Sequence, residues 1–205
     1  MTIIKIAEDD FESAVDVAVA LLKSGGIMVY PTDTVYGIGG DATREDVVES
    51  VRRIKGIMEK KPMSVLVSDF GMIEYYCETG IWEDMILKRY LPGPYTFILK
   101  KNERRYIPAS PTEKLGIRIP DSAFCQALCA RFGKPIITTS ANITTQAPPT
   151  RLEDVDKSVL AAVPLAIDGG QTKYRSPSVV IDLVGHKMLR EGNGKSISLI
   201  ELPEA

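Results

Sequence analysis

Several short segments of the sequence carry side chains that an enzyme could use, and the first is Pro31–Gly40. In it, Thr32 and Thr34 flank an aspartate directly after an apolar run. Loops that follow strands often carry functional residues, because the rigid strand behind them fixes their position. A stretch rich in threonine, aspartate and glycine is also ordinary turn chemistry. Both interpretations stay open for this segment taken alone.

The second segment is basic. Arg52, Arg53 and Lys55 end a predicted helix, and Lys60 and Lys61 follow in the loop before the next predicted strand. Lysine suits phosphate because it brings a flexible point charge. The alternative is that these cations interact with the dipole at the helix C-terminus, which fits the two arginines better than the loop lysines.

Two further segments place polar groups beside apolar runs. Ser140 and Asn142 stand two residues apart after a predicted buried strand, with Thr138 just upstream. Ligands of open α/β sheets bind at such strand ends, although Ser and Asn also build turns. Arg118 lies inside the short apolar strand 116–120, where its guanidinium needs a partner. A bidentate carboxylate would serve, from a ligand or from the protein itself.

The charge of the chain changes along its length. Residues 51–134 hold 15 basic and 9 acidic residues, whereas residues 1–50 hold 3 basic and 10 acidic residues. A basic middle third is typical of a protein that binds phosphate groups or nucleic acid. A solvated face of lysine and arginine is the alternative.

Other patterns exclude several classes of protein. No apolar run approaches the roughly 18 residues that a membrane span needs, and the N-terminus lacks a signal-peptide pattern. Three cysteines cannot form a disulfide framework, and no cluster has metal-ligand spacing. A Walker phosphate loop and a serine–histidine nucleophile motif are also missing. We therefore expect a cytoplasmic protein with no membrane segment and no protein metal site, folded as a single domain over residues 1–205.

Alternating strand and helix signals must position these side chains. Apolar residues at helical spacing predict helices over residues 11–22, 47–54, 72–76, 82–91, 122–132 and 152–163. Runs of β-prone residues predict strands over residues 3–6, 27–30, 64–67, 95–99, 116–120, 135–138, 165–167, 178–183, 187–190 and 197–202. Thr43 or Asp46 is expected to cap the second helix, and Thr150 the last one. Residues 31–40 are expected to form a loop.

Strands outnumber helices in this order, and several strands adjoin through short turns. We therefore predict an α/β (α+β) fold, in which helices flank a twisted mixed β-sheet.

Together these segments resemble the YrdC family of threonylcarbamoyl-AMP synthases, in the YrdC/YciO superfamily. The matching pieces, in the order of the family, are Gly25-Gly26, Pro31-Thr32-Asp33-Thr34-Val35-Tyr36-Gly37, Lys55, Leu91-Pro92-Gly93-Pro94-Tyr95-Thr96, Gly116-Ile117-Arg118-Ile119-Pro120, Ser140-Ala141-Asn142, Asp168-Gly169-Gly170, Ser176-Pro177-Ser178-Val179-Val180 and Leu189-Arg190-Glu191-Gly192. The resemblance implies a YrdC-like concave α/β sandwich. It also implies the first step of tRNA threonylcarbamoyladenosine synthesis, from L-threonine, bicarbonate and ATP.

The resemblance also implies a role for each candidate residue. Arg118 would hold the carboxylate of threonine in a bidentate pair, and Thr32, Thr34, Thr138 and Ser178 would line the threonine pocket. The residues that would contact ATP are Lys55, Lys60, Lys61, Lys114, Ser140, Asn142 and Arg190. Lys55 and Arg118 would be the catalytic pair, and Mg²⁺ is expected with ATP rather than at a protein site.

One motif departs from the family pattern. The family has Lys-x-Arg-Pro after the second helix, and this chain has Lys55-Gly56-Ile57-Met58. Lys60, Lys61 or Lys114 would then have to supply the missing charge. The YciO branch, which the strand 95–99 resembles, also lacks the full pattern. The alternative function is a YrdC/YciO-like module that binds tRNA or double-stranded RNA without synthase activity.

Overall fold

The structure is a computed structural model, and it describes residues 1–6, 11–57, 60–192 and 194. The predicted strand 197–202 and Met58 lie outside the described residues. The strands are β1 (Thr2–Lys5), β2 (Met28–Pro31), β3 (Tyr36–Gly39), β4 (Ser64–Leu66), β5 (Cys77–Glu78), β6 (Tyr95–Lys101), β7 (Lys114–Arg118), β8 (Ile136–Ser140), β9 (Leu165–Asp168), β10 (Val179–Asp182) and β11 (Lys187–Arg190). The helices are α1 (Phe11–Lys23), α2 (Glu45–Lys55), α3 (Phe70–Tyr76), α4 (Ile81–Tyr90), α5 (Ala123–Phe132), the 3₁₀ turn η1 (Leu152–Asp154) and α6 (Lys157–Ala161).

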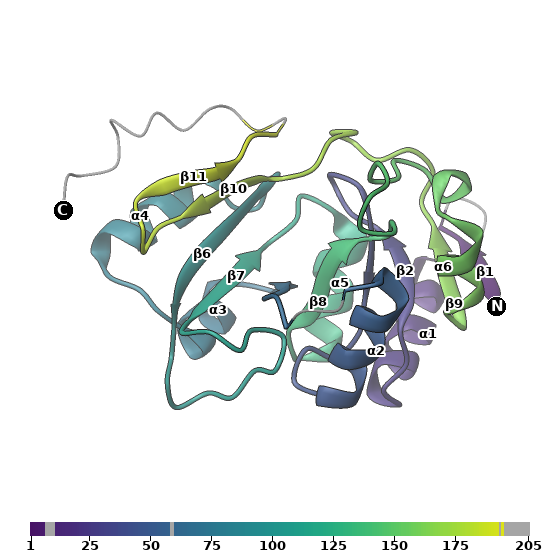
Figure 1. Cartoon of the computed structure of the whole chain (residues 1–205), viewed down its shortest axis with the longest axis horizontal. Helices are drawn as coiled ribbons and strands as arrows, with labels where there is room; N and C mark the ends of the chain where they lie inside the picture. The colour runs from purple at the N-terminus through teal and green to yellow at the C-terminus, as the bar shows by residue number, and fades with distance from the viewer. Residues whose placement is uncertain (7–10, 58–59, 193, 195–205) are drawn as a thin grey trace.

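The described strands form one continuous sheet, in the order β1-β9-β2-β3-β8-β4-β7-β6-β10-β11 with β5 beside β6 (Figure 1). β9 pairs in parallel with β1 and β2, β4 with β7, and β6 with β10. The other neighbouring pairs are antiparallel. This arrangement confirms the predicted mixed sheet with flanking helices.

Alternation along the strands divides the apolar residues between two core clusters. Met28 and Tyr30 of β2 belong to the cluster with α1 and α5, whereas Val29 between them belongs to the cluster with α2. Successive side chains of a strand point to opposite faces of the sheet, so one strand serves both clusters. The sheet is therefore covered on both sides, with α1 and α5 behind it and α2 and α6 in front in Figure 1.

The expectation of a loop over residues 31–40 is wrong for its second half. Tyr36–Gly39 is strand β3, which pairs antiparallel with β2 and with β8. A Cβ atom on Gly39 would lie 1.8 Å from the carbonyl oxygen of Ile137, so the two strands approach closely only because glycine stands there. Glycine is depleted in strands, and this is why the segment resembles a turn.

Neither of the two expected helix caps is found: Thr43 or Asp46 does not cap α2, and Thr150 caps neither η1 nor α6. The N-cap of α2 is Arg44, without a side-chain hydrogen bond, and Asp46 instead accepts hydrogen bonds from the Arg44 guanidinium. Thr43 donates its hydroxyl to Asp41. The predicted helix 152–163 is divided into η1 and α6, and Asp156 caps α6 by accepting from the backbone N–H of Ser158 at 2.8 Å. Local hydrogen bonds from short polar side chains compete here with the expected caps.

No helix in the described ranges combines the length and the apolar character that crossing a membrane requires.

Candidate active site

A cavity of about 300 Å³ opens where the β2–β3 turn meets β6, β7, β8 and β10. Eight of the candidate residues line it: Thr32, Thr34, Lys61, Arg118, Thr138, Ser140, Ser178 and Arg190. These residues come from segments that are distant in the sequence, and the mixed sheet brings them to one place. The fold therefore groups most of the predicted site residues around a single concave surface.

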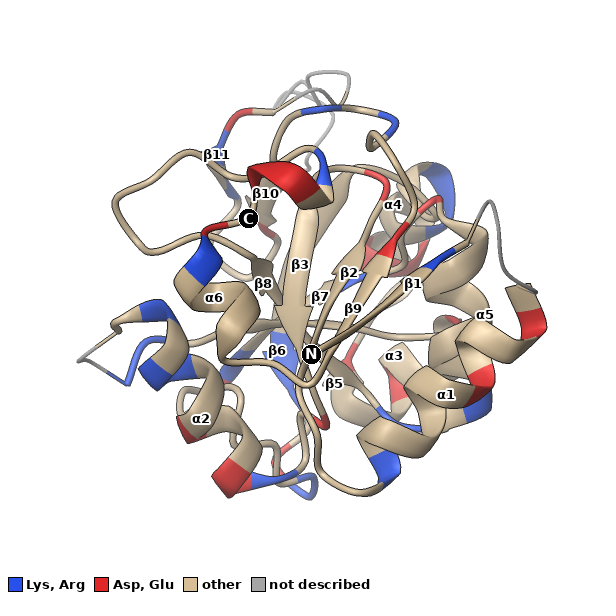
Figure 2. Ribbon diagram, turned by 90° about the vertical axis from the view of Figure 1, so that its right-hand side faces the viewer, with Lys and Arg blue, Asp and Glu red and all other residues tan. Residues whose placement is uncertain are grey.

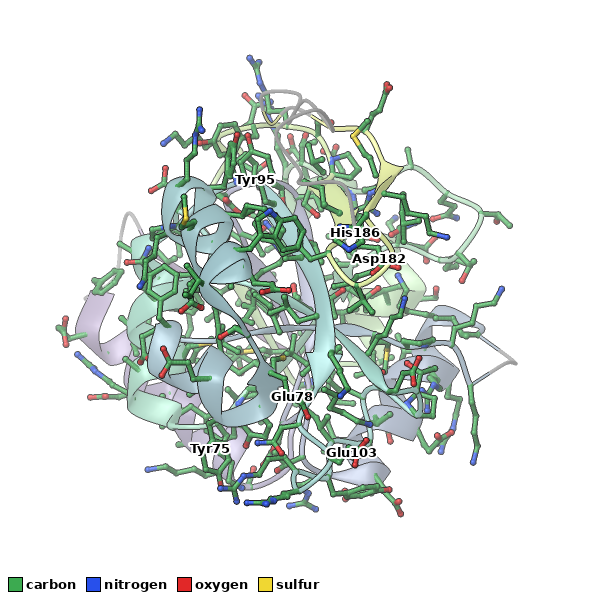
Figure 3. All side chains as sticks on the ribbon, turned by 90° about the vertical axis from the view of Figure 1, so that its left-hand side faces the viewer. Tyr75, Glu78, Tyr95, Glu103, Asp182 and His186 are labelled. Carbon is green, nitrogen blue, oxygen red and sulfur yellow. The ribbon has the colours of Figure 1, made fainter. Side chains whose placement is uncertain are left out.

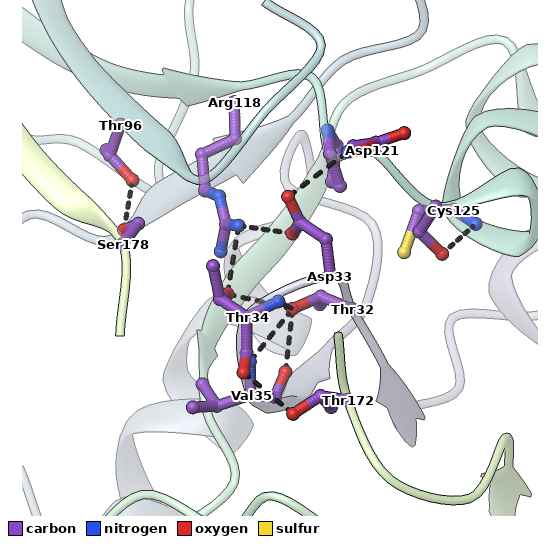
Figure 4. Close-up of polar contacts among 12 residues, drawn as sticks. Thr32, Asp33, Thr34, Val35, Thr96, Arg118, Asp121, Cys125, Thr172 and Ser178 are labelled. Carbon is purple, nitrogen blue, oxygen red and sulfur yellow. Dashed lines mark hydrogen bonds and ion pairs between the residues drawn. The ribbon is translucent and has the colours of Figure 1, made fainter. Parts of the chain in front are cut away.

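Arg118, at the end of β7, is buried beside the cavity and bound to the protein (Figure 4). Its Nη2 donates to Asp33 Oδ1 at 2.7 Å and to Thr34 Oγ1 at 3.0 Å. Nε is buried and has no hydrogen-bond partner among the described residues. The protein carboxylate that the sequence left as one alternative is thus present, but it occupies only one nitrogen. A bidentate pair with a ligand carboxylate that used Nη2 would have to displace Asp33 or Thr34.

Thr32 and Thr34 form a chain of hydrogen bonds that ends on this guanidinium. Thr32 Oγ1 donates to the carbonyl of Val35 at 2.7 Å and lies 3.0 Å from Thr34 Oγ1. Because the Thr32 hydroxyl hydrogen is committed to Val35, Thr34 must donate to Thr32, and Thr34 is left to accept from Arg118. Thr32 Oγ1 also accepts from the backbone N–H groups of Thr34 at 3.1 Å and of Val35 at 3.3 Å, so its lone pairs are occupied. Only the Thr34 hydroxyl therefore keeps an acceptor lone pair for a ligand.

Ser178 and Arg190 meet on the other side of the cavity. Arg190 in β11 donates from Nη2 to Ser178 Oγ and from Nε to the Ser178 carbonyl, both at 3.0 Å. Ser178 Oγ also lies 2.8 Å from Thr96 Oγ1, so β6, β10 and β11 are joined at this point. The positive charge of Arg118 is close enough to lower the pKa of Arg190, after burial as the main cause. Two guanidinium groups thus face one cavity.

Lys55 lies outside the cavity lining and is bound to backbone. Its Nζ donates to the carbonyl of Ser140 and, at 2.9 Å, to that of Asn142. The hydroxyl of Thr144, in the same turn, donates to the backbone carbonyl of Lys55 at 2.9 Å. Lys55 therefore fastens the end of β8 to the end of α2, and its ammonium does not reach the cavity in this structure.

Asn142 also lies away from the lining. Its Nδ2 donates to the carbonyls of Ile143 at 3.0 Å and of Gln146 at 2.6 Å, which closes the turn after β8. Ser140 is the last residue of β8 and does line the cavity. Of the two residues expected to face one ligand, Ser140 lines the cavity and Asn142 does not.

Of the three remaining candidate lysines, only Lys61 lines the cavity. Lys114 pairs with Asp182 at 2.9 Å, and it is outside the cavity lining, so the structure does not bring it to the site. Figure 3 shows Asp182 beside His186 at the turn between β10 and β11. His186 is exposed, as expected, and its ring lies 5.1 Å from that of Trp82. Lys60 is exposed and outside the lining, whereas Lys61 lines the cavity.

The structure supports the helix-dipole interpretation of the basic residues at the end of α2. Figure 2 shows acidic residues at the start of α2 and basic residues at its end, which is the favourable orientation for a helix dipole. Arg52 also donates from Nη2 to the Lys61 carbonyl at 3.1 Å. Arg52 thus anchors the loop that carries Lys61 to the cavity.

The electrostatic character of the cavity is cationic. Its described lining includes Lys61, Arg118 and Arg190 and contains no carboxylate. No group of three potential metal ligands occurs in the described part of the chain. The arrangement is suited to an anionic ligand of small-molecule size, such as a carboxylate or a phosphate ester.

Three residues at or beside the cavity are outside the predicted set of site residues. Asp33 supplies the counter-charge of Arg118, Thr96 contacts Ser178, and Ile57, which stands at the position of the missing family arginine, lines the cavity as Lys61 does. An aspartate within the Pro31–Gly40 motif was a usable signal. Its partner could not be inferred, because Arg118 is 85 residues away.

Replacing Lys55 by methionine should destabilise the protein through the turn after β8. Two charge-assisted hydrogen bonds disappear, which costs about 2 to 4 kcal/mol in the free energy of unfolding. Burial lowers the pKa of Lys55 to about 8 from its usual 10.5. The unfolded chain therefore binds more protons between these values, and the contribution of Lys55 to stability increases as pH rises through that window.

Urea unfolding of wild type and Lys55→Met at several values between pH 7 and 10 tests this account. The stability difference between them should widen in favour of wild type as pH increases. A difference that stays constant over the window would mean that Lys55 has its ordinary pKa, and an unchanged stability would mean that the two backbone contacts contribute nothing.

Relatives of known name share this sequence over most of its length. The model of the Sua5/YciO/YrdC family, described as "Telomere recombination", matches residues 20–192. A putative threonylcarbamoyl-AMP synthase of Methanocaldococcus jannaschii is 38% identical over 199 residues, which cover 93% of this chain and 92% of that protein. The threonylcarbamoyl-AMP synthase of Bos taurus is 36% identical over 177 residues, covering 83% of this chain and 63% of that protein.

Solved structures share the fold. Sua5 of P. abyssi, solved as a complex with L-threonine, has a TM-score of 0.84 at 29% identity, covering 94% of this chain and 58% of that one. YciO of E. coli has a TM-score of 0.79 at 26% identity, covering 89% of this chain and 91% of that one. The chain thus spans little more than half of the P. abyssi protein but nearly all of YciO. With the family motifs in order along the chain and the same sheet beneath them, this protein belongs to the Sua5/YciO/YrdC family.

Proposed function

We propose that this protein catalyses the ATP-dependent formation of threonylcarbamoyl-AMP, the first step of tRNA threonylcarbamoyladenosine synthesis. The amine of L-threonine and bicarbonate give a carbamate and water. An oxygen of the carbamate then attacks the α-phosphorus of ATP, and pyrophosphate leaves. The observation that carries the proposal is the cavity lined by Lys61, Arg118 and Arg190 without a carboxylate, in a chain whose relatives bear this activity in their names.

The described residues suit the two halves of the substrate differently. Nη1 of Arg118 has no hydrogen-bond partner among the described residues and would hold the carboxylate of threonine. Thr32, Thr34 and Thr138 would line the rest of the amino-acid pocket, and Ser178 would contact its far end. Because the Thr34 hydroxyl keeps a lone pair and the Thr32 hydroxyl is fully occupied, Thr34 suits the N–H of the carbamate or the substrate hydroxyl better than an anionic oxygen.

The phosphates require positive charge rather than a general base. Phosphoryl displacement depends mainly on positioning and on stabilising the charge of the leaving group. Lys61 and Arg190 would supply that charge, and the Ser140 hydroxyl would contact the nucleotide. Mg²⁺ would enter with ATP as part of the substrate, and no side chain is assigned to it. The proposed place of action is the cytoplasm, as the sequence predicts.

Binding of RNA stays a prediction, and it is the alternative function that the experiment below must distinguish from the synthase reaction. Arg118 is buried within the cavity and cannot reach a nucleic-acid backbone. A double-stranded RNA or tRNA partner would have to use exposed cations elsewhere.

Pyrophosphate release from ATP in bicarbonate buffer tests the proposal, measured with and without L-threonine. We expect release that depends on threonine. Turnover that ignores threonine would contradict the proposed substrate. Binding of RNA that weakens steeply with salt, in a protein indifferent to ATP and threonine, would instead identify the RNA-binding module.

Lys61 and Lys114 form a matched pair for locating the phosphates. Lys61→Ala should weaken ATP binding by about tenfold, because one charge-assisted hydrogen bond is lost. Lys114→Ala should leave ATP binding unchanged, since Lys114 pairs with Asp182 outside the cavity. Calorimetry at two salt concentrations gives both affinities, and the salt dependence should fall for Lys61→Ala only. Equal affinities for the two variants would remove Lys61 from the nucleotide site.

A further inference from the structure

Asp33 stands behind the candidate site without lining it. Its side chain is fully enclosed and pairs with Arg118, and the residue is absent from the described lining of the cavity. It borders instead a second cavity of about 280 Å³, on the side of the β2–β3 turn where α5 begins. A ligand in the main cavity would therefore meet Arg118 and not Asp33.

The carboxylate of Asp33 is held from several directions. Oδ1 accepts from Arg118 Nη2 at 2.7 Å, and Oδ2 accepts from the backbone N–H of Asp121 at 3.1 Å. The backbone carbonyl of Asp33 accepts from the N–H of Tyr174 at 2.8 Å. Both carboxylate oxygens and the backbone carbonyl of Asp33 are thus held, so the rotamer has little freedom. Figure 4 shows the contacts of the carboxylate with Arg118 and Asp121.

Arg118 needs this support because a second positive charge, that of Arg190, lies near it. Arg190 lines the same cavity, and the two charges disfavour each other. Without Asp33 the guanidinium would be a buried charge with a neutral Thr34 as its only partner among the described residues. With Asp33 in place, Nη2 is satisfied on both of its N–H groups, and Nη1 remains for a ligand.

We propose that Asp33 is a positioning residue, which holds the Arg118 guanidinium so that Nη1 faces the carboxylate of the amino-acid substrate. The inference rests on the proposed function and adds to it the residue that determines amino-acid affinity from outside the site. Asp33 acts on threonine recognition and not on the nucleotide, because among the described residues its side chain is connected to the cavity lining through Arg118.

Asp33→Asn and Asp33→Glu test the role from two sides. An asparagine cannot accept from both Arg118 and Asp121, because one of its two groups is a donor. A glutamate keeps the charge that stabilises the fold but moves the carboxylate by one methylene. In both variants the threonine KM should rise about 10- to 100-fold, as displacements near 1 Å do, while the ATP KM stays near that of wild type.

Asp41→Asn is the matched control. Asp41 is as buried as Asp33, binds Lys134 at 3.0 Å and Thr43, and lies outside the cavity lining. It should lower the melting temperature without moving the threonine KM. If Asp33→Asn fails to fold, Asp33→Glu decides. Asp33 variants that lose stability but keep the threonine KM of wild type would assign Asp33 a structural role and overturn the proposal.

A double-mutant cycle separates action through Arg118 from direct action. In an Arg118→Lys background, Asp33→Glu should add little to the threonine KM, because the group that it positions is already gone. Fully additive effects would contradict the proposal.

Calorimetric titration with L-threonine measures binding separately from the reaction, so the role of Asp33 and the proposed function can fail independently. A wild type that binds threonine without releasing pyrophosphate overturns the reaction, and Asp33 is then tested by threonine affinity alone. A wild type that does neither overturns both.

Discussion

Arg118→Ala is expected to reduce pyrophosphate release by at least about a hundredfold, because the substrate loses its fixed cationic partner. The same change leaves Asp33 as a buried and unpaired carboxylate, in which burial already raises the pKa. Breaking such a pair costs about 3 to 5 kcal/mol of stability. Activity and the melting temperature should therefore fall together in this variant.

Arg118→Lys separates the two effects. A lysine keeps a charge beside Asp33, so the melting temperature should stay close to that of wild type. Its single nitrogen cannot replace Nη2 toward Asp33 and Thr34 while it also presents Nη1 to a ligand. We expect a folded protein whose threonine KM rises sharply and whose ATP affinity is kept. A folded Arg118→Lys variant with the threonine KM of wild type would remove Arg118 from substrate binding.

Ile57→Arg is expected to raise the rate of adenylate formation by about tenfold or more, because a cationic clamp on a transferring phosphoryl group can be worth several powers of ten. Ile57 stands where the family pattern has its arginine, and the structure places it, half-buried, in the lining of the same cavity as Lys61. A new guanidinium would therefore face the cavity rather than the apolar core. The threonine affinity should not change, because the charge acts at phosphorus.

Ile57→Gln is the control for this gain, since it adds polarity and length without charge. A thermal melt beside the kinetic assay shows whether either variant disturbs the fold. A stable Ile57→Arg protein with an unchanged rate would mean that Lys61 already fills the role of the missing arginine.

Strands whose residues alternate or run apolar could be predicted from the sequence, and the mixed sheet followed from their order. β2 is an example, since the apolar run Met28, Val29 and Tyr30 predicts a strand that is buried on both faces. β3 could not, because its glycines are needed for contact with β8, which no local pattern reveals. The single domain over residues 1–205 stays a prediction.

For the candidate site, the sequence predicted several of the residues that lie there but not the contacts that they make. The residue type and its apolar setting were sufficient to find Arg118, whereas Ser178 and Arg190 followed from the family resemblance, and the structure brings all three to one cavity. Neither signal was sufficient to decide which hydrogen bonds each residue would make. Lys55 binds the carbonyls of Ser140 and Asn142, and Lys114 binds Asp182, which are partners 85, 87 and 68 residues away in the sequence. Long-range pairing of charges is a property of the fold, and the sequence carries no local sign of it.

The most direct test of the central claim is the identification of the product formed from ¹³C-bicarbonate, L-threonine and ATP. The account predicts threonylcarbamoyl-AMP that carries the label in its carbamoyl carbon, in amounts equal to the pyrophosphate released. Pyrophosphate release with an unlabelled adenylate, or with AMP alone and no labelled product in freshly quenched reactions, would contradict it.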